Sequence, residues 1–224
     1  MFGPDPESNP RLADVIAEAK KASFTKSSIE AAIARGQGRS ATGASLESVV
    51  IEGILPQNVA VIIDCETDNK NRTMMDVRMV MKEHGGNATP SSYLFAKKGR
   101  IVFEKREGLG VEEIFDEALE AGALDIVEDP EGRVVIYTEP SDTKATGTSL
   151  SQSLGLEIAA SDIIWDANDE TKVSLQDNDT AGELAEFIDV LQDREPSVQG
   201  VYLNVAKGSI DGDAWAALQD RITA

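Results

Sequence analysis

At 224 residues the chain is long enough for one large domain or two to three small ones, and its 41% hydrophobic and 27% charged content is typical of a soluble globular protein. No run approaches the roughly 18 consecutive apolar residues of a transmembrane helix. The acidic, proline-rich start resembles neither a signal peptide nor an Arg-rich transit peptide. Cys65 is the single cysteine, which excludes an intrachain disulfide and a cysteine-based zinc site.

The net charge of −19 is unevenly distributed along the chain. Residues 1–45 carry a net charge of +1, residues 46–100 a net charge of 0 and residues 101–224 a net charge of −20. Binding to RNA or DNA depends on neutralising phosphates, so the acidic second half should repel nucleic acid. Any nucleic-acid contact is therefore expected from the first hundred residues.

Two short helices are predicted at the start. Asn9 is a suitable N-cap and Pro10 suits the first helical position, and the apolar residues that follow have helical spacing. A second helix is predicted from Ser27, with Glu30 completing a capping box, up to Gly36. The Gly-, Ser- and Ala-rich stretch 36–45 is predicted to be a linker.

Strands and a polar loop come next. The residues at 46–51 and 59–65 are β-rich, and a helix with Met74, Val77, Val80 and Met81 inward is predicted from an N-cap at Thr73. Between them lies the run Thr67-Asp68-Asn69-Lys70-Asn71-Arg72-Thr73. A polar, amide-rich and basic loop between two regular elements is a usual place for binding contacts.

A second unit of alternating elements is predicted from residue 93. Residues 93–95 and 101–103 flank Lys97-Lys98-Gly99-Arg100, which predicts a hairpin with a basic tip. The remaining predicted elements are a helix at 111–121, strands at 124–127 and 134–137, a helix at 144–154, a strand at 156–164, a helix at 181–191 and a strand at 198–205. The last pair is too small to fold alone, so it must complete the first sheet or cover the second unit.

No catalytic, metal or cofactor signature is present. His84 is the single histidine, and its place in the last turn of a predicted helix favours an interaction with the helix carbonyls. The acidic run 177–179 departs from a calcium loop at the fifth and twelfth positions and is interpreted as a loop that caps the next helix. Gly108-Leu109-Gly110 lacks the third glycine of a dinucleotide fingerprint.

Four segments together resemble the YebC family. They are Asp5-Pro6-Glu7-Ser8-Asn9-Pro10-Arg11-Leu12, Glu52-Gly53, the seven-residue loop 67–73 and Gly85-Gly86-Asn87. The resemblance extends from Pro4 to about Lys207. The mitochondrial members of the YebC family include the translational activator of cytochrome c oxidase subunit I. Family members begin with a basic segment of roughly fifty residues that this chain lacks, so residues 1–45 are expected to be a partial N-terminal helical domain and linker.

The resemblance implies the fold. We expect an α+β protein with a small N-terminal helical unit plus two α/β sandwich-like domains, the third (ferredoxin-like) inserted in the second. The middle domain is expected at 46–106 plus 169–210, the inserted domain at 107–168 and a C-terminal tail at 211–224.

The resemblance also implies a function. We expect a non-enzymatic factor that activates mitochondrial translation by binding the ribosome, ribosomal RNA or mRNA. The alternative is a YebC-type DNA-binding transcriptional regulator, and an enzyme with an unrecognised site ranks third. A mitochondrial matrix location is expected, with the cytoplasm as the alternative. We expect a monomer with no cofactor, no metal and no membrane insertion.

The candidate RNA- or ribosome-binding residues come from two segments. The positive charges of Lys70 and Arg72 are unfavourable at the start of a helix, because the N-terminal end of the helix dipole is itself positive. Basic side chains beside free helical N–H groups can, however, bind phosphate. The simpler interpretation is that the loop only connects a strand to a helix, with Asn71 and Thr73 satisfying its N–H groups. The candidates are Asn69, Lys70, Asn71, Arg72, Lys97, Lys98 and Arg100.

Overall fold

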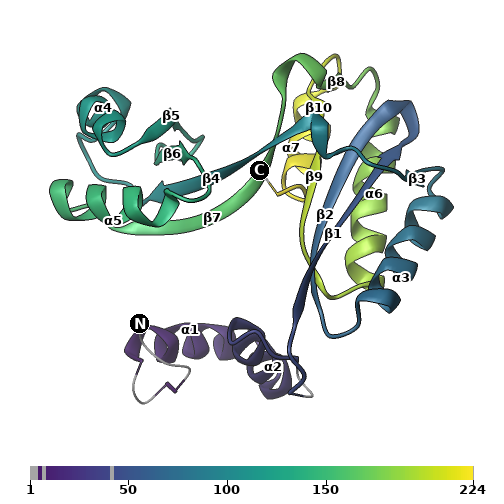
Figure 1. Cartoon of the computed structure of the whole chain (residues 1–224), viewed down its shortest axis with the longest axis horizontal. Helices are drawn as coiled ribbons and strands as arrows, with labels where there is room; N and C mark the ends of the chain where they lie inside the picture. Colours follow the sequence, from purple (N-terminus) through teal and green to yellow (C-terminus); the bar gives the residue numbers. More distant parts are fainter. Residues whose placement is uncertain (1–4, 7–8, 41–42, 224) are drawn as a thin grey trace.

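The computed structural model describes residues 5–6, 9–40 and 43–223. Glu7 and Ser8 of the first family segment and residues 41–42 of the expected linker lie outside them. Figure 1 shows three units, with the helical pair α1–α2 below a sheet covered by α3 and α6, and a second sheet reached through the long strands β4 and β7. None of the helices in the described ranges is long and apolar enough to cross a membrane.

The N-terminal unit is a pair of helices, α1 (Pro10–Lys21) and α2 (Lys26–Gly36). The side chain of Asn9 accepts a hydrogen bond from the Leu12 N–H at 3.2 Å, which confirms the predicted cap of α1. The cap of α2 is Thr25, which accepts from the Ser28 N–H at 3.2 Å, so the prediction of Ser27 was wrong by two residues. No side chain described in α2 is buried, so this unit has little core of its own.

The middle unit is an antiparallel sheet in the order β3-β1-β2-β9. Its strands are β1 (Glu47–Leu55), β2 (Val59–Thr67), β3 (Asn87–Ala88) and β9 (Val198–Leu203). The hairpin between β1 and β2 turns through a 3-10 segment at Pro56–Asn58, where Gln57 and Asn58 have positive φ values of 61° and 62°. A short parallel pair, β8 (Val173–Ser174) with β10 (Val205–Ala206), lies beside the sheet.

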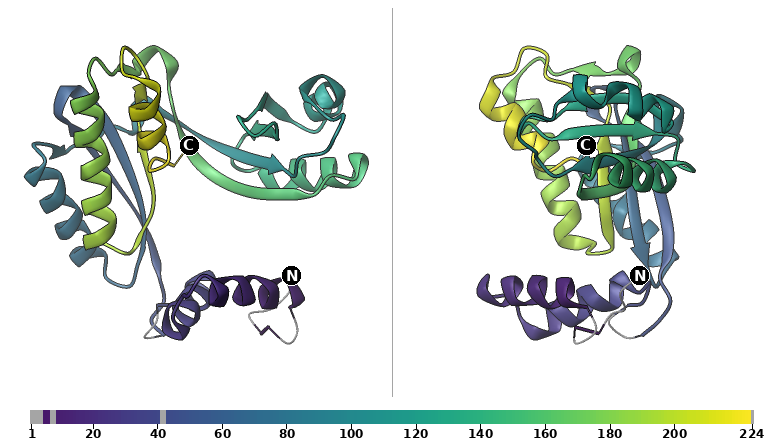
Figure 2. Two further views of the ribbon diagram at one scale, coloured as in Figure 1. Left: turned by 180° about the vertical axis from the view of Figure 1, so that it is seen from behind. Right: turned by 90° about the vertical axis from the view of Figure 1, so that its left-hand side faces the viewer.

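Three helices cover one face of this sheet, as Figure 2 shows from behind. They are α3 (Lys70–Glu83), α6 (Asn178–Arg194) and α7 (Gly212–Gln219). Alternate residues of β1 and β2, among them Ile51 and Ile63, pack on fully buried residues of α3 and α6 such as Val77 and Phe187. The expected tail at 211–224 therefore contains α7, whose Leu218 is fully buried in this core.

The inserted unit has the ferredoxin-like order. Its elements are β4 (Phe95–Phe103), α4 (Val111–Glu120), β5 (Ala123–Glu128), β6 (Val134–Thr138), α5 (Thr143–Leu154) and β7 (Ile158–Ala167). The sheet order is β5-β6-β4-β7 with antiparallel neighbours. The strand β9 then returns to pair with β2, and the predicted α+β fold with an inserted third domain is confirmed.

The predicted hairpin at 93–103 was wrong. Residues 95–103 form one continuous strand, in which Gly99 pairs with both Thr138 and Ile163. Gly99 is needed for space instead of for a turn, because a Cβ there would collide with the side chains of Thr138 and Thr143. Since β4 belongs to the second sheet, we propose that the inserted unit begins near Phe95 instead of residue 107.

A third hydrophobic cluster joins the two sheets. Ala60, Ile62 and Tyr202 of the first sheet contact Phe95 and Ile164 of the second. All five are at most 7% exposed. The inserted unit is therefore held to the middle unit by packing as well as by its two connecting strands.

Candidate functional site

The loop 67–73 forms the start of α3. The helix begins at Lys70 and its cap is Asn69, whose side chain accepts from the Arg72 N–H at 3.1 Å. The prediction of Thr73 as the cap was wrong, because Thr73 is fully buried and its hydroxyl donates to Thr67 Oγ1 at 2.9 Å. Asn69 therefore has a clear structural role, and Lys70 and Asn71 are exposed in the first turn.

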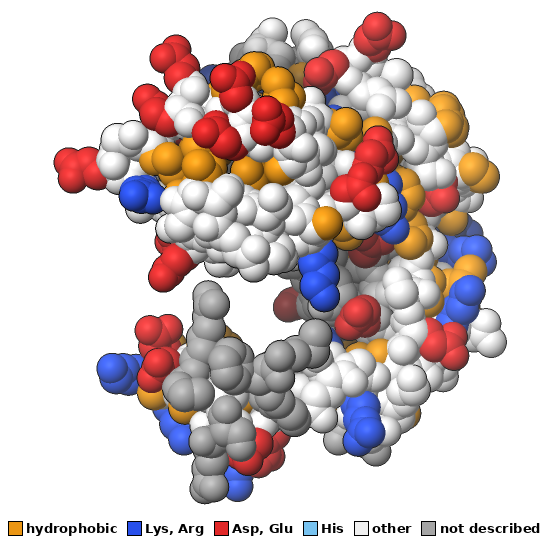
Figure 3. All heavy atoms as spheres, turned by 60° about the vertical axis from the view of Figure 1, so that its left-hand side comes forward, with side chains coloured by type: hydrophobic (Ala, Val, Ile, Leu, Met, Phe, Trp, Pro, Cys, Tyr) orange, Lys and Arg blue, Asp and Glu red, His pale blue; other side chains and the backbone are white. Residues whose placement is uncertain are grey.

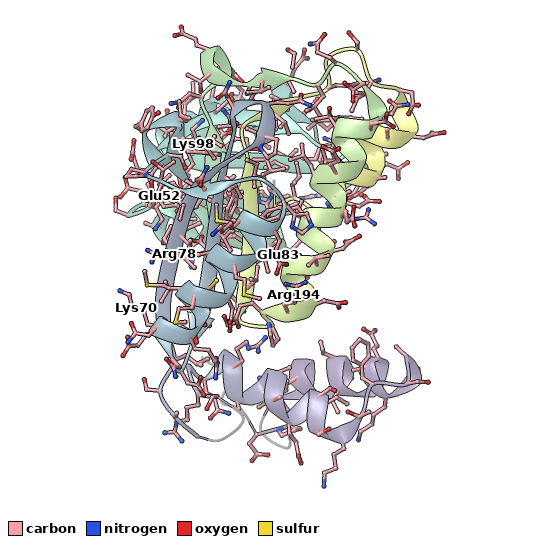
Figure 4. The ribbon with its side chains drawn as sticks, turned by 90° about the vertical axis from the view of Figure 1, so that its right-hand side faces the viewer. Glu52, Lys70, Arg78, Glu83, Lys98 and Arg194 are labelled. Atoms are coloured by element: carbon pink, nitrogen blue, oxygen red, sulfur yellow. The ribbon has the colours of Figure 1, made fainter. Side chains whose placement is uncertain are left out.

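The two basic residues of this loop have different surroundings. The Arg72 guanidinium lies 3.2 Å from the Asp68 carboxylate, one turn earlier. Lys70 has no carboxylate at ion-pair distance among the described residues. Figure 4 shows Lys70 at the end of α3 nearest the N-terminal helices. Lys70 is therefore the unpaired cation of this helix start.

Arg72 borders a cleft between the helical unit and the middle sheet. Arg35 and Arg39, from the end of α2 and the following turn, line the same cleft of ≈160 Å³. The carboxylates of Glu66 and Glu195 also line it, and Glu195 is only 3% exposed. Arg35 and Arg39 could not be chosen from the sequence, because the only signal there is a basic residue near the end of a short helix.

The basic residues of β4 separate from one another. Lys97 and Arg100 line a second, larger cleft of ≈560 Å³ between the two sheets. Lys98 lines a different cleft beside residues 166–171 and pairs with Asp166 at 2.6 Å. That bond raises the pKa of Lys98. The seven candidate residues thus do not form one site, although Glu66 borders both the cleft of Arg72 and that of Lys97.

The larger cleft mixes both charges. Arg100 lies 3.4 Å from Asp162 and its buried Nε has no hydrogen-bond partner among the described residues. Lys97 lies 5.1 Å above the Trp165 ring, a cation–π contact. Trp165 Nε1 donates to Asp64 at 3.4 Å. Burial raises the pKa of Asp64, against the opposing effects of this hydrogen bond and of the Lys97 charge.

The remaining family segments have structural roles. The Glu52 carboxylate accepts from the N–H groups of Ser91 and Ser92 at 2.7 and 2.8 Å. Burial opposes ionisation of Glu52, but these two bonds outweigh it and lower its pKa. Gly86 leaves room for the β1 backbone, since a Cβ there would lie 2.9 Å from the Ile54 carbonyl oxygen.

His84 caps the carboxyl end of α3 as predicted. Its Nδ1 is 2.9 Å from the Val80 carbonyl oxygen, and its ring meets Phe187 edge-on at 5.6 Å. The ring also borders a pocket of ≈240 Å³ with Gln57 and Thr180. These contacts account for His84 as a helix-end residue. Asp177 likewise caps α6 by accepting from the Thr180 N–H at 2.8 Å, as expected for the acidic run.

Comparison with known proteins gives the family. The model of the TACO1/YebC second and third domain matches residues 46–205, and that of the TACO1/YebC protein N-terminal domain matches residues 1–39. The chain belongs to the TACO1/YebC family.

Several proteins similar to this chain are bacterial. A "Probable transcriptional regulatory protein" of Persephonella marina is 41% identical over 205 residues, covering 90% of this chain and 80% of that protein. One of Aeromonas salmonicida with the same description is 38% identical, covering 96% and 84%. The crystal structure of the conserved hypothetical protein Aq1575 from Aquifex aeolicus is similar with a TM-score of 0.64 and 37% identity, covering 94% of this chain and 84% of that one.

The family membership confirms the predicted resemblance at the level of the family. These bacterial relatives give no support to the mitochondrial type of member or to a mitochondrial location. Their names describe regulation of transcription, which agrees with the alternative function better than with the translation factor.

Proposed function

We propose that this chain is a regulator of gene expression that works by binding nucleic acid, without catalysing a reaction. The observation that carries the proposal is Lys70. It lies at the exposed first position of α3, where helical N–H groups favour anions, and it has no carboxylate partner among the described residues. Lys97, exposed at the mouth of the larger cleft, is the second unpaired cation of the candidate set. Both are suited to phosphate oxygens.

The form of the proposal that we test first is binding to RNA on the ribosome, which would make the chain a translation factor. Residues 101–224 carry a net charge of −20 and include α6 and α7 as well as most of the inserted unit, so a long duplex lying across the whole molecule would meet repulsion from both units. A contact limited to the start of α3 and to Lys97 uses cations that all come from the first hundred residues. Lys70 and Lys97 would then contact phosphates directly, while Arg72, Lys98 and Arg100 would have to exchange their carboxylate partners first.

A DNA-binding transcriptional regulator is the second candidate, and the names of the bacterial relatives favour it. In that form the same cations would contact the phosphates of duplex DNA. The bacterial origin of the relatives fits a cytoplasmic protein in either case. The rings of Trp165 and Tyr137 lie under Lys97 and Lys98 as cation–π partners, and base-specific stacking has no part in the proposal.

Ribosome co-sedimentation and duplex DNA binding, each measured over a salt series, test the two forms. If the first form is right, the chain sediments with ribosomes in a salt-dependent way and binds duplex DNA weakly. Lys70→Ala with Arg72→Ala should lower the slope of log affinity against log salt by about two, because each lost phosphate contact removes about one unit. Binding to duplex DNA alone would support the second candidate instead.

The matched control is Lys144→Ala with Lys207→Ala, which removes two exposed lysines from the acidic part of the chain. This variant has the same net charge as the test variant and should retain the wild-type salt slope. Equal losses in the two variants would mean that the chain responds only to total charge, and the assignment to α3 would be rejected.

A further inference from the structure

The outer face of α3 carries an exposed apolar and basic stripe. The side chains of Met75 and Met79 are 71% and 57% exposed, one helical turn apart. Arg78 and Lys82, each three residues after a methionine, are exposed on the same stripe. Neither cation has an ion-pair partner among the described residues. Exposed methionines in an adaptable surface are typical of a contact site.

The outer face of α4 carries the opposite arrangement. The side chains of Phe115 and Leu119 are each 47% exposed, again one turn apart. Glu112 and Asp116, each three residues before an apolar residue, are exposed on that stripe and have no ion-pair partner within the described ranges. Figure 3 shows hydrophobic side chains with acidic ones around them on the upper part of the molecule, where the inserted unit comes forward.

We propose that α3 of one copy of this chain packs antiparallel against α4 of a second copy. A single register pairs all four positions of each stripe. Met75 then faces Leu119 and Met79 faces Phe115, which buries the four exposed apolar side chains together. In the same register Arg78 faces Asp116 and Lys82 faces Glu112.

The parallel orientation lacks this agreement. With Met75 opposite Phe115 and Met79 opposite Leu119, Arg78 would face Ala118, which is fully buried, and Lys82 would face Gly122 beyond the end of α4. Charge complementarity therefore favours the antiparallel orientation. It also favours α4 as the partner of α3, because two basic α3 stripes or two acidic α4 stripes would repel each other.

A second copy is required because the two helices lie at opposite ends of the molecule. Figure 1 shows α3 on the outer side of the middle unit and α4 at the far end of the inserted unit, and Figure 2 shows the same separation from behind. One chain cannot bring its own stripes together. The contact joins different surfaces of the two copies, and such heterologous contacts form rings or chains according to the rotation between copies.

The association should be weak and sensitive to salt. A single pair of short helices buries less than the roughly 1,200 Å² at the low end of stable protein interfaces. Half of the facing positions are charged and near the surface, so salt of about 0.5 M screens their attraction. The monomer expected from the sequence is then the state at high salt or at high dilution.

Sedimentation equilibrium of the full chain at low salt, over a concentration series to several hundred micromolar, tests the proposal. The average mass of the wild type should rise with concentration. The α3 variant R78E with K82E and the α4 variant E112K with D116K should each stay monomeric, with association weakened at least about tenfold. An equimolar mixture of the two variants should associate again, because every facing pair between one variant and the other has opposite charges.

The matched controls reverse charges on other exposed helices. K20E with K21E on α1, and E183K with E186K on α6, should associate like the wild type. Met75→Gln with Met79→Gln weakens association without changing any charge, which covers the case in which a reversal unfolds its helix. Circular dichroism checks the fold of each variant. A wild type that stays monomeric throughout the series overturns the proposal, as does a mixture of the two reversal variants that stays monomeric.

Discussion

At the scale of single residues, two neighbours on β2 have opposite surroundings. Asp64 faces the cleft between the sheets, where Trp165 donates a hydrogen bond to it. Cys65 faces the helices and is 1% exposed. Alternation along a strand places them on opposite faces of the sheet. The carboxyl group is partly desolvated at the junction of two units, and the thiol is part of the first core.

Replacing Asp64 with Asn should stabilise the protein at neutral pH. Burial raises the pKa of Asp64 in the folded state. The contribution of Asp64 to the stability of the fold is therefore fully present below the unfolded pKa of about 3.9, and it is lost as the pH rises through the folded pKa. Asp64→Asn keeps an acceptor for Trp165 and has no charge to desolvate. In urea titrations, the free energy of unfolding of Asp64→Asn should therefore be higher than that of the wild type at pH 7. The difference between the two should shrink as the pH is lowered toward 4.

Asp193→Asn, at an exposed position of α6, is the control and should change stability little at any of these pH values. A gap for Asp64→Asn that does not depend on pH would contradict the desolvation argument. A less stable Asp64→Asn variant at pH 7 would contradict it as well.

Cys65 should be unreactive in the folded protein. Burial raises its pKa to about 12, with the nearby Glu195 and Asp64 charges adding to the increase. The thiolate is the reactive form, so labelling by a disulfide reagent at pH 7.5 should be at least roughly a thousandfold slower than for a free cysteine of pKa about 8.5. A cysteine introduced at exposed Ser153 in a Cys65→Ser background should label at the free rate. Fast labelling of native Cys65 would show that the first core opens readily.

At the scale of elements, the start of α3 separates a structural residue from a binding residue. Asn69→Ala removes the cap of a 14-residue helix and should cost about 1 kcal/mol of unfolding free energy. Lys70→Ala should stay within about 0.5 kcal/mol, because the side chain is exposed and has no ion pair within the described ranges. Urea titration measures both. Asn69→Asp keeps a capping oxygen, so it should remain near the wild type, and an equal loss for Asn69→Asp and Asn69→Ala would count against the cap.

The sequence predicted the elements that depend on a local pattern of residues. It did not predict the features that depend on packing between segments far apart in the chain. Asn9 before Pro10, and the spacing of Val77 and Val80, predicted helices that the structure contains. Lys97-Lys98-Gly99-Arg100 predicted a turn because glycine beside polar residues is common in turns. Gly99 instead accommodates Thr143 of α5, a contact across 44 positions of the chain that no local pattern could indicate.

In the candidate site, too, some features could be predicted from the sequence and others could not. Lys70 and Arg72 could be chosen from sequence because their charge is unusual at a helix start. The carboxylate partners of Lys98 and Arg100, Asp166 and Asp162, come from β7 and lie more than 60 positions away. Those ion pairs follow from the register of β4 with β7, which requires the inserted fold to be known.

At the scale of the whole molecule, the junction between the two sheets should couple their unfolding. Trp165 lies at this junction and Trp215 packs against the first core, so variants that keep only one tryptophan report on different regions. With no further substitution, the two single-tryptophan variants should unfold at the same urea concentration. Ile62→Ala removes a fully buried side chain from the junction cluster and should cost about 2–5 kcal/mol, separating the two transitions.

Ile63→Ala is the matched control for this coupling. Ile63 is the next residue of β2, is equally buried, and faces the first core instead of the junction. Its loss should lower the unfolding midpoint of both reporters while keeping the two transitions together, because the junction cluster remains intact. If Ile63→Ala separated the transitions as much as Ile62→Ala, the coupling would depend on the stability of the middle unit alone. The packing of Ile62 against Ile164 and Phe95 would then have no particular part in joining the units.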